Sequence, residues 1–189
     1  IAISNWHYDG ERGITYIIDA RDLFGHGYQT IELRDTTSLS RLYASFVGEE
    51  PGDMSGRNIA MGDINNDGRV DLIIAAPGHS EGGAWAGKKY FILGDKDIGG
   101  DGAVHILSSS QEFVYATYVG SDDNQHSETG WPALAVGSVG YGSHNGDVNG
   151  DGIPDILIGT NGASSARGAV QILLGKETPV PCERGDLNG

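Results

Sequence analysis

The chain has 189 residues, of which 31 are glycine, and carries a formal net charge of −14. The length suits one domain with a sizeable core, and glycine without a three-residue period indicates a turn-rich fold rather than collagen. The acidic excess argues against nucleic acid as a partner, and no apolar run is long enough for a transmembrane helix, so no membrane insertion is expected.

The single cysteine, Cys182, excludes an internal disulfide. The first residues, Ile-Ala-Ile-Ser, lack the basic segment that begins a signal peptide. A mature or excerpted extracellular chain fits both observations.

Short strands dominate the predicted elements along the chain. Runs of β-branched and aromatic residues bounded by glycine and polar residues predict strands, in order at 1–4, 13–18, 30–33, 41–46, 57–62, 72–76, 88–93, 103–107, 112–119, 133–136, 156–159 and 168–174. Either 88–93 or 103–107 is equivalent to 13–18, and the pattern does not decide between them. Helix signals are nearly absent, and the regular spacing favours an all-β repeat architecture.

Two loops repeat the pattern Asp-x-Asn-x-Asp-Gly-x-x-Asp. Their oxygen-bearing side chains at positions 1, 3, 5 and 9 are Asp63, Asn65, Asp67 and Asp71 in the first loop, and Asp147, Asn149, Asp151 and Asp155 in the second. Calcium binds six to eight oxygen ligands of this kind, whereas magnesium usually keeps several waters. No histidine or cysteine stands among the predicted ligands of either loop, which argues against zinc or copper.

The other loop positions fit the same interpretation. Gly68 and Gly152, at position 6, permit the positive φ of a sharp turn. At position 7, Arg69 and Ile153 would each contribute a main-chain carbonyl. We therefore predict two Ca²⁺ sites, and a third loop that begins with Asp186 and Asn188.

Two alternatives to this cation loop were weighed. An EF-hand requires Glu at position 12 and a following helix, but position 12 is Ile74 or Ile158, within a short apolar run typical of a buried strand. Ordinary Asn/Asp/Gly turns form without metal. The second complete copy, with a further Asp at the same offset, favours the cation loop over such turns.

Residues 63–78, together with the preceding 52–60, resemble the FG-GAP repeat of integrin alpha-subunit β-propellers and related bacterial surface proteins. The resemblance implies an all-β fold of propeller-like blades of short antiparallel strands, with calcium in the loop between the first two strands of a blade. It divides the chain into a partial first blade (1–50), a blade with the first loop (51–120), a blade with the second loop (121–180) and the start of a third loop (181–189). Because closed propellers have four to eight blades, we expect only part of a propeller.

The function implied is that of a calcium-binding, non-enzymatic repeat domain of an extracellular or cell-surface protein, serving adhesion, ligand binding or structural assembly. The expected partner is a protein or glycan ligand, or copies of the chain itself in a homo-oligomer or filament. Two alternatives stay open: a subunit of an extracellular filament or sheath, and an accessory, sugar-binding propeller of a secreted hydrolase or lyase.

Three further signals have simpler explanations. Residues 78–82 match the Gly-x-Ser-x-Gly nucleophile elbow, which requires a following helix, but 83–87 contain no helix start. Residues 184–186 spell Arg-Gly-Asp, although Asp186 is explained as position 1 of a cation loop. The tryptophans Trp6, Trp85 and Trp131 lie in or near glycine-rich loops, where packing between blades is favoured over a ligand surface.

Overall fold

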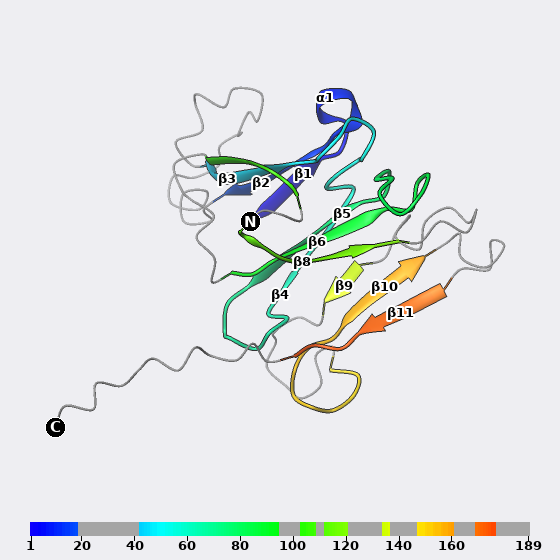
Figure 1. The fold of residues 1–189 in the computed structure, drawn as a ribbon. Coiled ribbons are helices and arrows are strands. Elements are labelled where there is room, and N and C mark those ends of the chain that lie inside the picture. The colour runs from blue at the N-terminus through cyan, green and yellow to red at the C-terminus, as the bar shows by residue number, and fades with distance from the viewer. Residues whose placement is uncertain are drawn as a thin grey trace, which may run out of the picture.

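A computed structural model describes residues 1–18, 42–94, 103–108, 112–120, 134–136, 147–160 and 169–176. These residues form three sheets of short strands and one single-turn helix (Figure 1). No helix among them is long and apolar enough to cross a membrane. The prediction of a nearly all-β fold, compatible with part of a β-propeller, is confirmed.

The N-terminal sheet, called sheet A, has the strand order β1-β2-β3-β7. Its strands are β1 (Ala2–Asn5), β2 (Ile14–Ile18), β3 (Leu42–Val47) and β7 (Ala103–Ile106), and the short helix α1 (Tyr8–Glu11) connects β1 to β2. Neighbouring strands are antiparallel except β3 and β7, which pair in parallel. Sheet A therefore takes its last strand from a segment that follows β6 in the chain.

The central sheet, sheet B, has the order β4-β5-β6-β8 and is antiparallel throughout. Its strands are β4 (Asn58–Gly62), β5 (Asp71–Ala76), β6 (Lys88–Ile92) and β8 (Val114–Val119). Every residue of β5 and β6 is buried. Such continuous burial is expected of a strand covered on both faces, and it explains why β5 is an apolar run rather than an alternating one.

The C-terminal sheet, sheet C, has the order β11-β10-β9 and is also antiparallel. It consists of β9 (Leu134–Val136), β10 (Ile156–Thr160) and β11 (Ala169–Leu173). Burial alternates along β11, where Val170 and Ile172 are exposed. One face of β11 therefore lacks a covering layer among the described residues.

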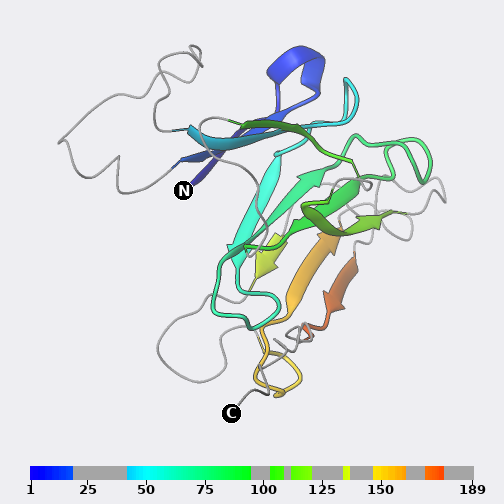
Figure 2. The same ribbon diagram turned by 60° about the vertical axis from the view of Figure 1, so that its left-hand side comes forward.

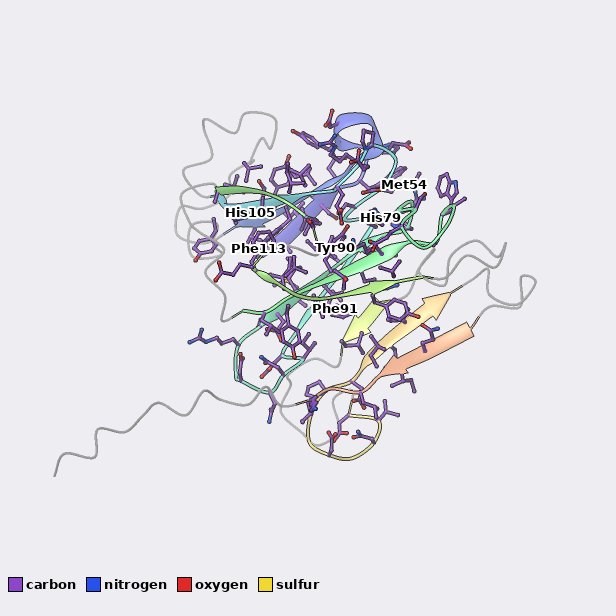
Figure 3. The ribbon with its side chains drawn as sticks, viewed as in Figure 1. Met54, His79, Tyr90, Phe91, His105 and Phe113 are labelled. Atoms are coloured by element: carbon purple, nitrogen blue, oxygen red, sulfur yellow. The ribbon has the colours of Figure 1, made fainter. Side chains whose placement is uncertain are left out.

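Sheet B lies between sheets A and C (Figure 2). Two apolar clusters join the three sheets. Phe46 of sheet A packs with Ile74 and Tyr90 of sheet B, and Ile73 and Phe91 of sheet B pack with Ile158 of sheet C. Tyr90 and Phe91 are neighbours on β6 and point to opposite faces of sheet B (Figure 3), as consecutive strand residues do. Sheet B thus lies between the other two, in the manner of neighbouring blades.

The structure decides which of two segments follows β5 in its sheet. Residues 88–92 form β6 beside β5, whereas 103–106 form β7 in sheet A. Residues 169–173 are similar in sequence to 103–107. They nevertheless form β11 beside β10, the strand that follows the second loop as β5 follows the first, so β11 corresponds to β6 and not to β7. The strand expected at 30–33 lies outside the described residues.

Candidate functional site

The first predicted cation loop, residues 63–70, is the tip of the β4–β5 hairpin, which closes with Gly62 paired to Asp71. Gly68 has a φ of 83°, so the positive backbone angle predicted at position 6 is confirmed. The strand β5 that follows also confirms that this is not an EF-hand.

Backbone N–H groups hold the acidic side chains inside this loop. The Asp63 carboxylate accepts hydrogen bonds from the N–H groups of Asp67 (3.1 Å) and Gly68 (2.8 Å). Asp67 accepts one from Arg69 N–H (2.8 Å), and the Asn65 side-chain amide donates to Asp67 Oδ2 (3.0 Å). Asp63, Asn65 and Asp67 are therefore brought together by the turn itself.

Asp71, at position 9, is fully buried and connects the loop to the rest of sheet B. Its two oxygens accept hydrogen bonds from Ile64 N–H (2.8 Å) and Gly94 N–H (2.7 Å). Burial raises the pKa of Asp71 above its ordinary value, the two backbone donors oppose this, and the negative charges of Asp67 and Asp63 raise it further. The three carboxylates thus lie close enough to repel one another.

The second loop repeats these bonds at equivalent positions. Asp147 accepts from the N–H groups of Asp151 (3.1 Å) and Gly152 (2.7 Å), and Asn149 Nδ2 donates to Asp151 Oδ2 (2.9 Å). Fully buried Asp155 accepts the other pair, from Val148 N–H (2.6 Å) and Gly175 N–H (2.9 Å).

The donor atoms fit a hard cation in kind, because both loops present aspartate and asparagine oxygens. Within the described residues no lysine or arginine forms an ion pair with Asp63, Asp67 or Asp71, so their mutual repulsion lacks a counter-charge there. Equally, no three acidic, histidine or cysteine groups in that part of the chain already surround a common point. The atom of Asn65 that would bind calcium is Oδ1, which accepts a hydrogen bond from Asp67 N–H (3.2 Å).

In sheets B and C, the glycine after the third strand is a position of the site that the sequence analysis missed. A Cβ on Gly94 would lie 2.4 Å from Val70 O, and one on Gly175 would lie 2.3 Å from Pro154 O. Only glycine lets these N–H groups reach Asp71 and Asp155. The signal was present as a Leu-Gly pair closing both strands, at 93–94 and 174–175.

The remaining site predictions have different outcomes. Arg69 is exposed and Ile153 is buried at position 7, and the metal role of their carbonyls remains a prediction. Asp186 and Asn188 of the third loop lie outside the described residues, as does the Arg-Gly-Asp tripeptide. Ser80 of the Gly-x-Ser-x-Gly match lies between β5 and β6, so a strand follows where the nucleophile elbow needs a helix.

A second candidate site lies at the other end of β5, where sheets A and B meet. It is a pocket of about 710 Å³ formed by the β3–β4 loop and the β5–β6 loop. Its charged lining residues are Glu49, Glu50, Asp53, His79, Glu81 and Lys88. The two loops touch through their backbones, since Gly78 N–H donates to Asp53 O (2.9 Å).

Ion pairs between lysine and glutamate side chains connect these two loops. The ammonium of Lys88, which is 2% exposed, donates to Glu49 Oε1 (2.8 Å) and Glu81 Oε2 (2.6 Å). The Tyr90 hydroxyl also donates to Glu49 Oε1 (2.6 Å). Burial lowers the pKa of Lys88, but the two carboxylates outweigh burial and raise it, so a buried cation is maintained.

His79 extends this network across the junction. Its Nδ1 lies 3.1 Å from Asp53 Oδ2 and its Nε2 lies 3.6 Å from Glu81 Oε2. The Nδ1 contact is close but poorly aligned for a hydrogen bond. Burial lowers the pKa of His79, and the contact with Asp53 outweighs it, so the net pKa is raised.

The chain was compared with known proteins. The model of the FG-GAP repeat matches residues 55–107 and 139–173. Similar proteins include the phosphatidylinositol-glycan-specific phospholipase D of Dictyostelium discoideum, 28% identical over 76% of this chain, and that of Mus musculus, 34% identical over 61%. Integrin alpha-PS3 of Drosophila melanogaster is 25% identical over 93% of the chain.

The chain spans 13–15% of the length of these curated relatives. The first FG-GAP match covers the first loop with β4, β5, β6 and β7, and the second covers the second loop with β10 and β11. The oxygen-rich loops and the short antiparallel strands agree with these matches. The chain contains FG-GAP repeats, at residues 55–107 and 139–173, and is similar to integrin alpha-PS3.

Proposed function

We propose that the chain is a calcium-binding, non-enzymatic part of an extracellular or cell-surface β-propeller, where it serves adhesion, ligand binding or assembly. The observation that supports this best is the repetition of one hydrogen-bond pattern in two loops, each ending in a buried aspartate bonded to the glycine after the third strand. An ion that holds the loop in one conformation would therefore also hold the end of the third strand in place.

The chain's own residues would act as follows. Asp63, Asn65 and Asp67 present oxygens at the loop tip, and Asp71 holds the tip against the end of β6. Calcium would supply the positive charge that offsets their repulsion. The result is a rigid blade edge at the loop end of β5.

The test is thermal unfolding of the 189-residue chain in excess calcium and in excess EGTA, with magnesium as the comparison ion. Free ligand at a thousand times its Kd stabilises a protein by about 4 kcal/mol per site, so the melting temperature should rise clearly with calcium. Asp67→Asn combined with Asp151→Asn should remove the response, whereas Glu112→Gln, which removes an exposed carboxylate that belongs to neither loop, should not. Identical melting curves in calcium and EGTA would refute the metal role.

A second candidate function is supported by the names of two relatives, both phosphatidylinositol-glycan-specific phospholipases D. In this alternative the repeats are the accessory propeller of a secreted hydrolase. The coding sequence that flanks residues 1 and 189 decides between the two: a hydrolase domain in the same reading frame supports the accessory role, and further repeats alone support the adhesive one.

A further inference from the structure

We propose that the pocket between sheets A and B binds a glycan that carries free amino groups, through its carboxylates and the ring of Trp85. This deepens the ligand-binding part of the proposed function by naming the class of ligand and the residues that contact it. It is independent of calcium, because the pocket and the loops lie at opposite ends of β5.

The size and the framework of the pocket suit a small ligand. Its volume of about 710 Å³ lies within the range of about 300–1,000 Å³ typical of ligand sites. The Lys88 ion pairs and the backbone contact between Gly78 and Asp53 hold its two loops together. A ligand would thus meet walls that are already in place.

The charge of the lining selects a cation. Four carboxylates, those of Glu49, Glu50, Asp53 and Glu81, face one ammonium and one imidazole, so negative charge remains even when His79 is protonated. The Glu50 carboxylate has no ion pair with any described residue, and Glu81 is half exposed. An acidic pocket of this kind raises the local concentration of cations and repels phosphates and uronic acids.

Trp85 supplies a flat apolar surface at the same pocket. Its side chain is 48% exposed, although tryptophan usually gains most from burial. The backbone φ of Trp85 is 62°. The backbone N–H of Trp85 donates to Ser80 Oγ (3.4 Å), and this bond holds the loop that carries the indole. An indole face can stack on the apolar face of a sugar ring and attracts cations more strongly than other aromatic rings.

Buried polar atoms complete the pocket. His79 is 8% exposed, and its Nδ1 has no aligned hydrogen bond with any described residue. Hydroxyl groups of a ligand could bond to the carboxylate oxygens of Glu50 and Glu81, while the buried His79 Nδ1 lies in the pocket wall, 3.1 Å from Asp53 Oδ2. A linear polyamine has the charge but no ring face to stack on Trp85, and a neutral sugar has the ring face but no charge, whereas an amino sugar has both.

The deciding experiment is isothermal titration calorimetry of the whole chain with two matched tetrasaccharides. Tetraglucosamine and tetra-N-acetylglucosamine differ only in acetylation, which removes the positive charges. We expect the free-amine form to bind at least tenfold more tightly, and the difference to shrink as salt is raised from 50 to 300 mM. Equal affinities, or no binding of either sugar, would overturn the proposal.

Two further probes separate the source of the cation. Spermidine and an arginine-containing peptide carry charge without a sugar ring. Either should bind less tightly than tetraglucosamine, and tighter binding of either would overturn the assignment to an amino sugar.

Variants locate the site. Trp85→Ala and Glu50→Gln should each weaken tetraglucosamine binding about tenfold or more, with unchanged melting temperature. The matched controls, Tyr115→Ala and Glu112→Gln, change an exposed aromatic and an exposed carboxylate elsewhere and should leave binding unaltered. Wild-type affinity in both pocket variants would place the sugar elsewhere and refute the proposal. Titration in calcium and in EGTA separates the two hypotheses, since sugar binding should persist even if the calcium response fails.

Discussion

Sheets B and C carry the same loop in different surroundings. The register places Lys89 of β6 opposite Ala75 and Val170 of β11 opposite Gly159, so the two residues are equivalent. Lys89 is 2% exposed and Val170 is 69% exposed, the reverse of what lysine and valine prefer. Yet the hydrogen bonds that hold the buried aspartate and the first loop aspartate recur in both sheets. Local bonds therefore determine the loop, and neighbouring sheets determine the burial.

The largest expected effect tests whether the buried aspartate is equally important in both loops. Asp71→Ala would leave the N–H groups of Ile64 and Gly94 without their acceptor, at about 1–3 kcal/mol each. Asp155→Ala removes the same pair in a loop whose Asn149 and Asp151 are exposed, where water can replace the lost acceptor. Urea unfolding should therefore show the larger loss of stability for Asp71→Ala. A larger loss for Asp155→Ala would contradict the difference in burial.

The next effect concerns the equivalent pair Lys89 and Val170. The Lys89 ammonium donates no hydrogen bond to any described residue, and its Nζ lies 5.8 Å from the centre of the Tyr118 ring. Burial lowers the pKa of Lys89 from 10.5 to about 8. Lys89→Val should therefore stabilise the chain at pH 7, by about 3 kcal/mol at 1.36 kcal/mol per pKa unit. Val170→Lys, at an exposed position, is the matched control and should change stability by less than about 0.5 kcal/mol.

The sign of the pH dependence follows from the same shift. The folded chain gives up the Lys89 proton near pH 8, but the unfolded chain keeps it until about pH 10.5. The penalty for burying this cation is full below pH 8, and stability rises as the pH increases through that window. Lys89→Val should remove this rise when unfolding is followed from pH 7 to 10. An unchanged profile would show that Lys89 is not the group that titrates.

A smaller effect should come from the glycines that donate to the buried aspartates. Gly94→Ala and Gly175→Ala each force a Cβ against a backbone oxygen, and overpacking of this kind costs about 1–3 kcal/mol. The loss should be greater for Gly94, because Sheet B is covered on both faces and has less freedom to shift. Calorimetric melting of both variants tests this order, and equal losses would show that the covering sheets do not matter here.

The smallest effect separates the loops at position 4. Asn66 has a φ of 58° and Gly150 one of 81°. Asparagine tolerates this region better than other residues with a side chain. Gly150→Asn should cost under about 0.5 kcal/mol and Gly150→Ala about 1 kcal/mol. A difference in the opposite direction would show that the two turns differ in backbone geometry.

Much of this fold and of the loops could be predicted from the sequence, because their causes are local. Alternation and β-branched runs mark the strands, and the spacing of Asp63, Asn65 and Asp67 marks the turn that gathers them. Burial of Lys88 could not be predicted, since its partner Glu49 lies 39 residues away, in the loop that follows β3 of sheet A. The pocket escaped notice for the same reason: its two walls come from loops that only the packing of sheet A on sheet B brings together.

The parallel pairing of β7 with β3 has a consequence for the order of assembly. Residues 103–106 complete sheet A, although β4, β5 and β6 are made in between. During synthesis, sheet A cannot pair with its last strand, β7, until β4, β5 and β6 of sheet B have been made. The first two sheets are in this way tied into one cooperative folding unit, so that damage to either should be felt by both.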